Sequence, residues 1–164
     1  MRPVPLLVSV ALLPFLAAGA QTPPRAKLAA SITRLFGQGA RVDSLHVDSN
    51  TVLRVSRRDS LLGFAEVGNV IGKSEPITFL VAIAPDDRLK DVDILVYREP
   101  RGGEVAYEAW RKQFRGKTAA DSVRVGKGGI RSISGATISV HAVTAGVRRM
   151  LGDLTAWHHA GKIR

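Results

Sequence analysis

The sequence predicts an α+β fold, a single domain in which an antiparallel β-sheet meander is covered by an N-terminal helix and by C-terminal helices. Apolar and β-branched residues alternate with a period of two between residues 41 and 97, and short turns separate the runs. Helical spacing of apolar residues appears before and after this region. The composition agrees, because 164 residues of which 45% are hydrophobic suit one globular domain with its own core.

Residues 1–20 are predicted to be a secretory signal peptide. Arg2 precedes an apolar stretch from Val4 to Ala18, and Ala18 and Ala20 form a small-residue pair before the expected cleavage point. The stretch is shorter than the roughly 20 residues that span a bilayer, which favours cleavage over a retained anchor. We therefore expect an exported protein, in the periplasm or on the outer face of the cytoplasmic membrane.

The N-terminal extension, residues 21–40, contains the first predicted helix. Leu28, Ile32 and Leu35 are spaced as on one helix face. Five period-two runs then predict strands at Val42–Val47, Thr51–Val55, Leu62–Ile71, Ile77–Ala84 and Leu89–Tyr97. The connections are too short for parallel crossovers, so neighbouring strands are expected to be antiparallel.

Helical spacing returns after the last strand. Tyr107, Trp110 and Phe114 form one apolar stripe, which predicts a single helix over residues 104–115. A polar, glycine-containing loop over residues 116–132 follows. Long loops in small domains are often functional, so this loop is a candidate binding segment.

A final helix is predicted from Thr137 to Trp157, with a stripe of apolar residues on one face. The main domain then spans residues 41–157, and residues 158–164 form a C-terminal tail. His158 and His159 in this tail are expected at the surface without partners.

The chain carries 24 Lys and Arg against 14 Asp and Glu, a formal net charge of +10. Nearly all of the excess lies in residues 109–164, where Asp121 and Asp153 are the only acidic residues. This basic third is interpreted either as a solvated face, which can lie near anionic lipid, or as the surroundings of a bound anion. Export and the lack of interleaved aromatic residues argue against nucleic-acid binding.

The absence of cysteine excludes disulfides, thiolate nucleophiles, Cys-ligated iron–sulfur clusters and CxxCH haem attachment. The four histidines do not have the spacing of a metal site, so no metal is expected. Redox chemistry in this chain would therefore depend on an organic cofactor.

The segment Ile133–Ser139 (ISGATIS) lies at the predicted start of the final helix. A helix start offers free backbone N–H groups and the positive end of the helix dipole, and Gly135 with Ala136 leaves room for a phosphate. The alternative is structural, with Ser134 or Thr137 acting only as an N-cap.

SGATIS followed by an amphipathic helix resembles the signature of the FMN-binding domain family, found in small flavoprotein subunits of the sodium-pumping quinone reductase and the Rnf complex. Three further segments are similar to this family, namely Gly72–Phe79, the Pro loop Arg98–Gly103 and Gln113–Lys117. Together the four motifs cover about residues 60–150.

The resemblance implies FMN attached through its phosphate to the Thr137 hydroxyl by a separate flavin transferase, with Ser134 as the alternative hydroxyl. The cofactor-binding residues that it implies are Thr137, Ser134, Gly135, Ala136, Ser139, Trp110, Pro100, Gly102, Gly103 and Lys117. The bases available to screen the phosphate are Lys117, Arg124, Lys127 and Arg131, with His141 one turn along the helix. Trp110 is the first choice for stacking on the flavin ring, ahead of Tyr107 and Phe79.

Two positions depart from the family pattern. Arg131 stands where the family often has Asp, six residues before the modified threonine, and Arg101 stands where Gly is usual. The first departure concerns recognition by the transferase, and the second concerns packing of the ring.

The resemblance implies a flavin electron carrier that works between a redox donor and an acceptor at or near the membrane, possible partners being a membrane reductase complex and the lipid surface. Two alternatives are an FMN-dependent reductase of a small substrate and a non-redox module that binds anions or lipid.

Overall fold

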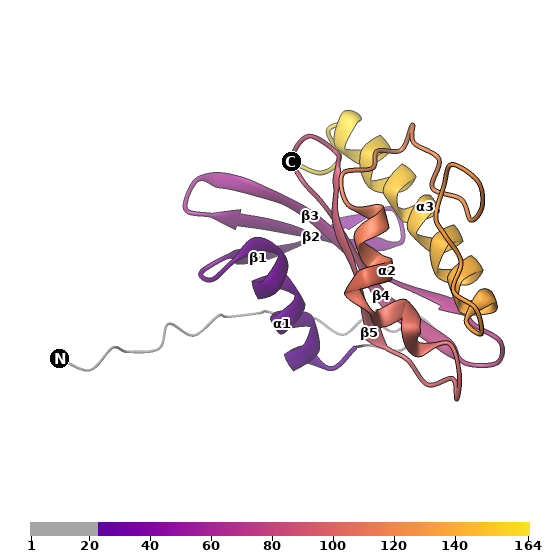
Figure 1. The fold of residues 1–164 in the computed structure, drawn as a ribbon. Helices are drawn as coiled ribbons and strands as arrows, with labels where there is room; N and C mark the ends of the chain where they lie inside the picture. Colours follow the sequence, from indigo (N-terminus) through magenta and orange to yellow (C-terminus); the bar gives the residue numbers. More distant parts are fainter. Residues whose placement is uncertain (1–22) are drawn as a thin grey trace.

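The computed structural model describes residues 23–164, so the predicted signal peptide lies outside the described residues. The chain forms one five-stranded antiparallel sheet in the order β1-β2-β3-β4-β5 (Figure 1). The strands are β1 (Arg41–Val47), β2 (Asn50–Arg57), β3 (Ser60–Ile71), β4 (Pro76–Ile83) and β5 (Leu89–Val96). Each strand pairs with the next one in the sequence, which confirms the predicted meander.

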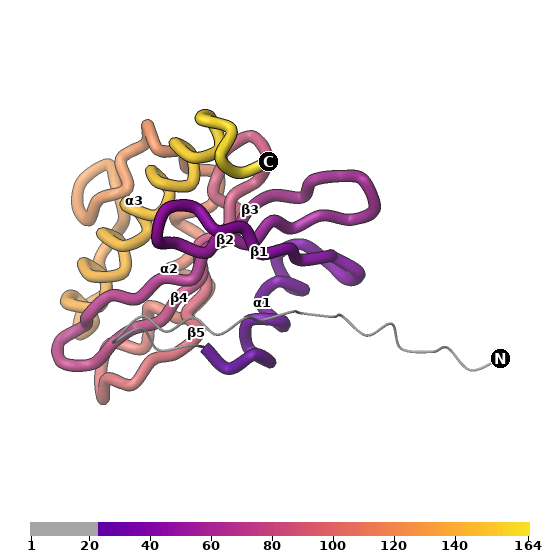
Figure 2. The backbone as a smooth tube through the Cα atoms, turned by 180° about the vertical axis from the view of Figure 1, so that it is seen from behind, coloured from indigo at the N-terminus to yellow at the C-terminus, as the bar shows by residue number. Residues whose placement is uncertain are grey.

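Helices cover both faces of this sheet, as predicted (Figures 1 and 2). The short helix α1 (Arg25–Phe36) buries Ile32 and Phe36 against one face, and the long helix α3 (Thr137–His159) buries its apolar stripe against the other. Neighbours in β4 serve opposite faces, because Phe79 packs with the α3 side and Leu80 with the α1 side. The sheet is therefore buried on both sides at its centre.

The single helix predicted for residues 104–115 is wrong. The segment consists of a 3-10 turn η1 (Gly103–Ala106), a one-turn helix α2 (Glu108–Arg111) and a second 3-10 turn η2 (Lys112–Phe114). Tyr107 breaks the helix with extended backbone angles, φ −71° and ψ 135°. Tyr107 is 64% exposed, while Trp110 and Phe114 are buried in the core, so the predicted stripe holds for only two of its three residues.

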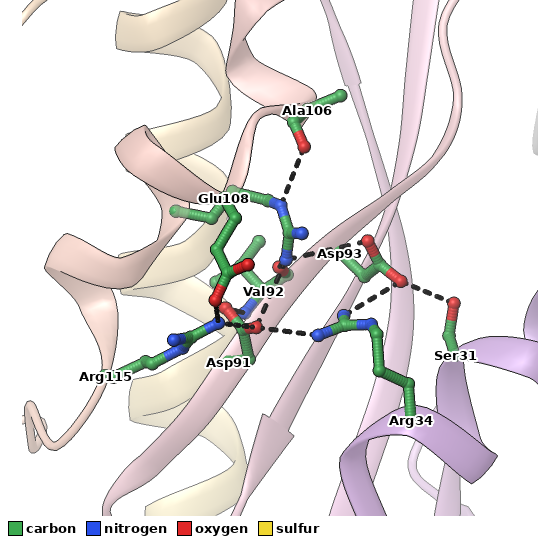
Figure 3. A network of polar contacts seen from close by, with 9 residues as sticks. Ser31, Arg34, Asp91, Val92, Asp93, Ala106, Glu108 and Arg115 are labelled. Carbon is green, nitrogen blue, oxygen red and sulfur yellow. Dashed lines mark hydrogen bonds and ion pairs between the residues drawn. The ribbon is translucent and has the colours of Figure 1, made fainter.

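A buried carboxylate explains why this segment lies where it does (Figure 3). Asp91 on β5 is 1% exposed, and its Oδ2 accepts hydrogen bonds from Arg34 at 3.0 Å, Arg111 at 3.2 Å and Arg115 at 3.0 Å. Arg34 belongs to α1, Arg111 to α2, and Arg115 follows η2. One side chain thus connects three segments, and removing one partner of such a buried pair is costly.

The edge of β5 is also covered. Arg111 donates to the Val92 carbonyl at 2.5 Å, and the backbone of Leu89 exchanges hydrogen bonds with Gly116 and Lys117. These contacts occupy backbone groups that an edge strand would otherwise leave open for pairing with another chain.

The C-terminal end of α3 is tied to the sheet, so the expectation that His158 and His159 lack partners is wrong. His158 Nδ1 lies 2.7 Å and His159 Nε2 lies 2.8 Å from the two oxygens of Asp87, in the β4–β5 turn. Trp157 Nε1 donates to Asp48 in the β1–β2 turn. Within residues 23–164, no helix has both the length and the apolar character needed to cross a bilayer.

Glu66 on β3 is a buried acid beneath α3. It is 6% exposed, and no described residue donates a hydrogen bond to its Oε2. Burial is the main cause that raises the pKa of Glu66 to about 7; Asp153 adds to the increase, and Arg149 opposes it.

We predict that Glu66 lowers the free energy of unfolding as the pH rises from its ordinary pKa of 4.5 to about 7. In this range the folded protein keeps the proton and the unfolded chain has lost it, so stability falls with pH and then levels off. Urea denaturation from about pH 5 to about pH 8 should show the wild type losing up to about 3 kcal/mol relative to Glu66→Gln. Parallel pH profiles of the two proteins would contradict this prediction.

Candidate functional site

The ISGATIS segment ends in the first turn of α3, as predicted. Thr137 is the first helical residue, and Ala136 precedes it as the N-cap. The first intrahelical hydrogen bond is donated by Val140 to the Ala136 carbonyl at 2.9 Å, and no side chain caps the helix. Neither Ser134 nor Thr137 therefore acts as the N-cap, and the backbone N–H groups of the first turn stay available to an anion.

The surface around this helix start is open. Gly135 has φ +84°, and a Cβ built on it would meet nothing within 4 Å. Ser134, Gly135 and Thr137 lie at the surface, while Ala136 is buried and points into the core. A phosphate can therefore approach the backbone at Gly135 and reach the Thr137 hydroxyl.

The Pro loop Arg98–Gly103 packs directly against the same turn. Tyr97 Oη donates to the Arg101 carbonyl at 2.5 Å and lies 2.9 Å from Ser139 Oγ. Gly102 has φ +94°, and a Cβ there would lie 2.5 Å from Tyr97 Oη and 2.7 Å from Ser139 Oγ. Gly102 therefore lies directly against Ser139, and the Pro loop and the ISGATIS segment meet in space.

Glu99 connects the Pro loop to the β3–β4 hairpin on its other side. Its Oε1 accepts hydrogen bonds from the backbone N–H of Ser74 at 2.6 Å and of Glu75 at 2.9 Å. These two bonds hold the pKa of Glu99 below its usual range. The loop is therefore fixed between the hairpin and α3.

The backbone of residue 131, six positions before Thr137, is held by two side chains. Trp110 Nε1 donates to the Arg131 carbonyl, and Gln113 Oε1 accepts from the Arg131 N–H, both at 2.9 Å. We call Trp110 and Gln113 the 131 clamp. It fixes the start of the segment that leads to Thr137, while the Arg131 side chain stays exposed.

The aromatic candidates for ring stacking are placed differently. Trp110 is 4% exposed and packs edge-on against Phe114, with ring centroids 5.1 Å apart. Phe79 is fully buried beneath Gly146 of α3. Of the three residues proposed for stacking on the flavin ring, Tyr107 alone is exposed.

The structure does not bring Lys117 next to Thr137. The Lys117 carbonyl accepts from the Leu89 N–H at the start of β5, whereas Tyr97 and the Pro loop follow its other end. At about 3.3 Å per residue these ends are roughly 23 Å apart. Arg124, Lys127 and His141 are exposed, the first two on the loop before α3 and the third in its second turn.

Sequence reasoning missed the roles of Tyr97, Glu99 and Gln113. Tyr97 appeared only as the end of an alternating strand, and Gln113 only as a letter in a motif. Tyr97 contacts Ser139, 42 positions away, and Gln113 contacts Arg131, 18 positions away, so no local pattern predicted these two contacts.

The geometry defines a domain that can hold a phosphate-bearing ligand at the start of α3. Comparison with known proteins agrees, because residues 72–152 match the profile of the FMN-binding domain family. The matched region includes the Pro loop, the 131 clamp and Thr137. The chain belongs to the FMN-binding domain family, and its cofactor is FMN.

One curated relative is a subunit of the proton-translocating ferredoxin:NAD(+) oxidoreductase complex of Clostridium ljungdahlii. It is 32% identical over 93 residues, which make up 52% of this chain and 50% of the relative. The chain thus spans about half the length of the relative that it matches.

We predict that Gln113→Ala loosens the segment before Thr137. The substitution leaves the Arg131 N–H without its acceptor, so the free energy of unfolding should fall by about 1 kcal/mol. Hydrogen exchange at the Arg131 amide should be faster. Gln38→Ala, in the exposed turn after α1, is the matched control and should change stability by less than about 0.5 kcal/mol. Equal effects of the two substitutions would contradict the clamp.

Proposed function

We propose that this protein is an exported electron carrier that holds FMN covalently, as a phosphoester of the Thr137 hydroxyl. The observation that carries the proposal is the exposed hydroxyl at the uncapped start of a 23-residue helix, inside the region that matches the family. A non-covalent site would need the protein to compete for FMN outside the cell, whereas an ester keeps the site filled.

The first turn of α3 suits a phosphodiester. Its free N–H groups and the helix dipole stabilise a negative charge by about 0.3–1 kcal/mol at an exposed site. Arg131 is exposed on the segment that leads to the helix, six residues before Thr137, and adds positive charge to that segment. Glu99 and Glu104 lie close enough to Tyr97 to raise its pKa, so the region of the Pro loop and the first turn of α3 carries charges of both signs.

FMN supplies the redox chemistry, because it accepts and returns electrons. The role of the protein is to position the FMN. The 131 clamp fixes the approach to Thr137, and the Pro loop forms a wall beside it. Thr137 is exposed in the first turn of α3, so a group attached there stays accessible to a redox donor and an acceptor.

Covalent attachment and electron transfer both require partner proteins. A flavin transferase is required to form the ester, and the relative's place in a proton-translocating redox complex supports a donor or acceptor at the membrane. The predicted signal peptide supports export, with the mature chain beginning at Gln21.

The test is co-expression with a flavin transferase, followed by denaturation and intact mass measurement. We predict that the wild type and Ser134→Ala gain one FMN less one water, and that Thr137→Val gains nothing. Valine keeps the shape of threonine without the hydroxyl, and an unchanged melting temperature would show that the variant folds. The same spectra report whether the chain begins at Gln21.

An adduct that persists in Thr137→Val would contradict the attachment point. A wild type without an adduct, under conditions in which a known acceptor domain is modified, would contradict covalent binding altogether.

A further inference from the structure

We propose that Tyr97, Ser139 and the tight turn at Gly102 form a clasp that sets how closely the Pro loop covers FMN bound at Thr137. This inference rests on the proposed function. Tyr97 and Ser139 are positioning residues in it, because they act through the loop and through the first turn of α3.

The clasp has a defined direction. A phenol has one proton, and Tyr97 donates it to the Arg101 carbonyl. The 2.9 Å contact with Ser139 must then be a bond in which the Ser139 hydroxyl donates to Tyr97 Oη. A chain of two bonds thus runs from α3 through the end of β5 to the Pro loop.

The clasp also fixes the rotation of the first helical turn. Residues two positions apart point about 200° apart around an α-helix. Ser139 is 4% exposed and faces the sheet, so Thr137 faces outward, as its exposure shows. Anchoring Ser139 therefore orients the attachment hydroxyl.

Gly102 sets how closely the backbone of the Pro loop approaches Ser139. Its positive φ and the 2.5 Å and 2.7 Å distances from an added Cβ to the two hydroxyl oxygens leave no space for a side chain. The loop backbone consequently lies directly on Ser139, two residues from Thr137. Glu99 holds the far side of the same loop on Ser74 and Glu75, so releasing the clasp frees only the side next to α3.

The phenol is kept protonated at neutral pH. Partial burial raises the pKa of Tyr97, the hydrogen bond with Ser139 acts in the opposite direction, and Glu99 and Glu104 add to the increase. The chain of bonds therefore persists under ordinary conditions.

The test compares Tyr97→Phe, Ser139→Ala and the double variant with the wild type, all as full chains. In the unloaded proteins, exchange of the Val105 amide, which donates to the Gly102 carbonyl, should be about fivefold faster in each variant, since losing one hydrogen bond shifts the opening equilibrium by about that factor. In the FMN-loaded proteins, the iodide quenching constant of flavin fluorescence should rise about twofold, because the loop opens more often. The reduction potential should shift as well.

The double variant should behave like either single variant, because the loss of either hydrogen bond already releases the Pro loop from α3. Thr78→Val is the matched control. It removes a buried hydroxyl that donates to Asn69 at 2.6 Å within the sheet, so it should lower stability and leave the quenching constant and the potential unchanged.

Loaded variants that quench like the wild type would overturn the inference and leave the attachment at Thr137 standing. A wild type that gains no FMN would overturn both proposals, and the mass spectrum identifies that case. Should Tyr97→Phe fail to fold, Ser139→Ala removes only one oxygen atom and tests the clasp by the same exchange and quenching measurements.

Discussion

The close approach of α3 to strands β3 and β4 determines where the site lies. Two glycines permit it, since a Cβ on Gly68 would lie 2.5 Å from Met150 Sδ and one on Gly146 would lie 2.6 Å from Phe79 Cζ. Each large apolar side chain buried in this contact stabilises the fold by about 1.5–3 kcal/mol. The helix is thereby fixed along its length, and its first turn falls beside the Pro loop.

The two ends of α3 have different chemistry. Its C-terminal end is closed, because His158 and His159 meet Asp87 and Trp157 meets Asp48. Its N-terminal end has no side-chain cap and is bordered by the Pro loop, the β3–β4 hairpin and the segment held by the 131 clamp. This asymmetry leaves one charged helix terminus available for a ligand and uses the other for stability.

The sequence alone predicted the sheet and the long helix, because period-two and period-3.6 patterns report directly which residues are buried. It also located the start of α3 and the Gly102 loop, since glycines and hydroxyl residues mark turns and helix ends. The break at Tyr107 was not predictable from local spacing. It follows from Asp91, which draws Arg111 and Arg115 onto β5 from about 20 residues away.

The same limit explains Lys117 and Trp110. The family resemblance implies that both residues contact the flavin. Backbone hydrogen bonds with Leu89 instead hold Lys117 at the far end of β5, and core packing turns the Trp110 indole toward residue 131. Such positions depend on contacts between distant parts of the chain.

The ³¹P NMR signal of the FMN-loaded chain, denatured and separated from free flavin, tests the central claim most directly. A phosphomonoester loses a second proton with a pKa of about 6, whereas a diester has no second proton to lose. The account predicts one phosphorus resonance that stays with the polypeptide and does not move between about pH 5 and about pH 8. A resonance that titrates, or a chain without phosphorus, would contradict it.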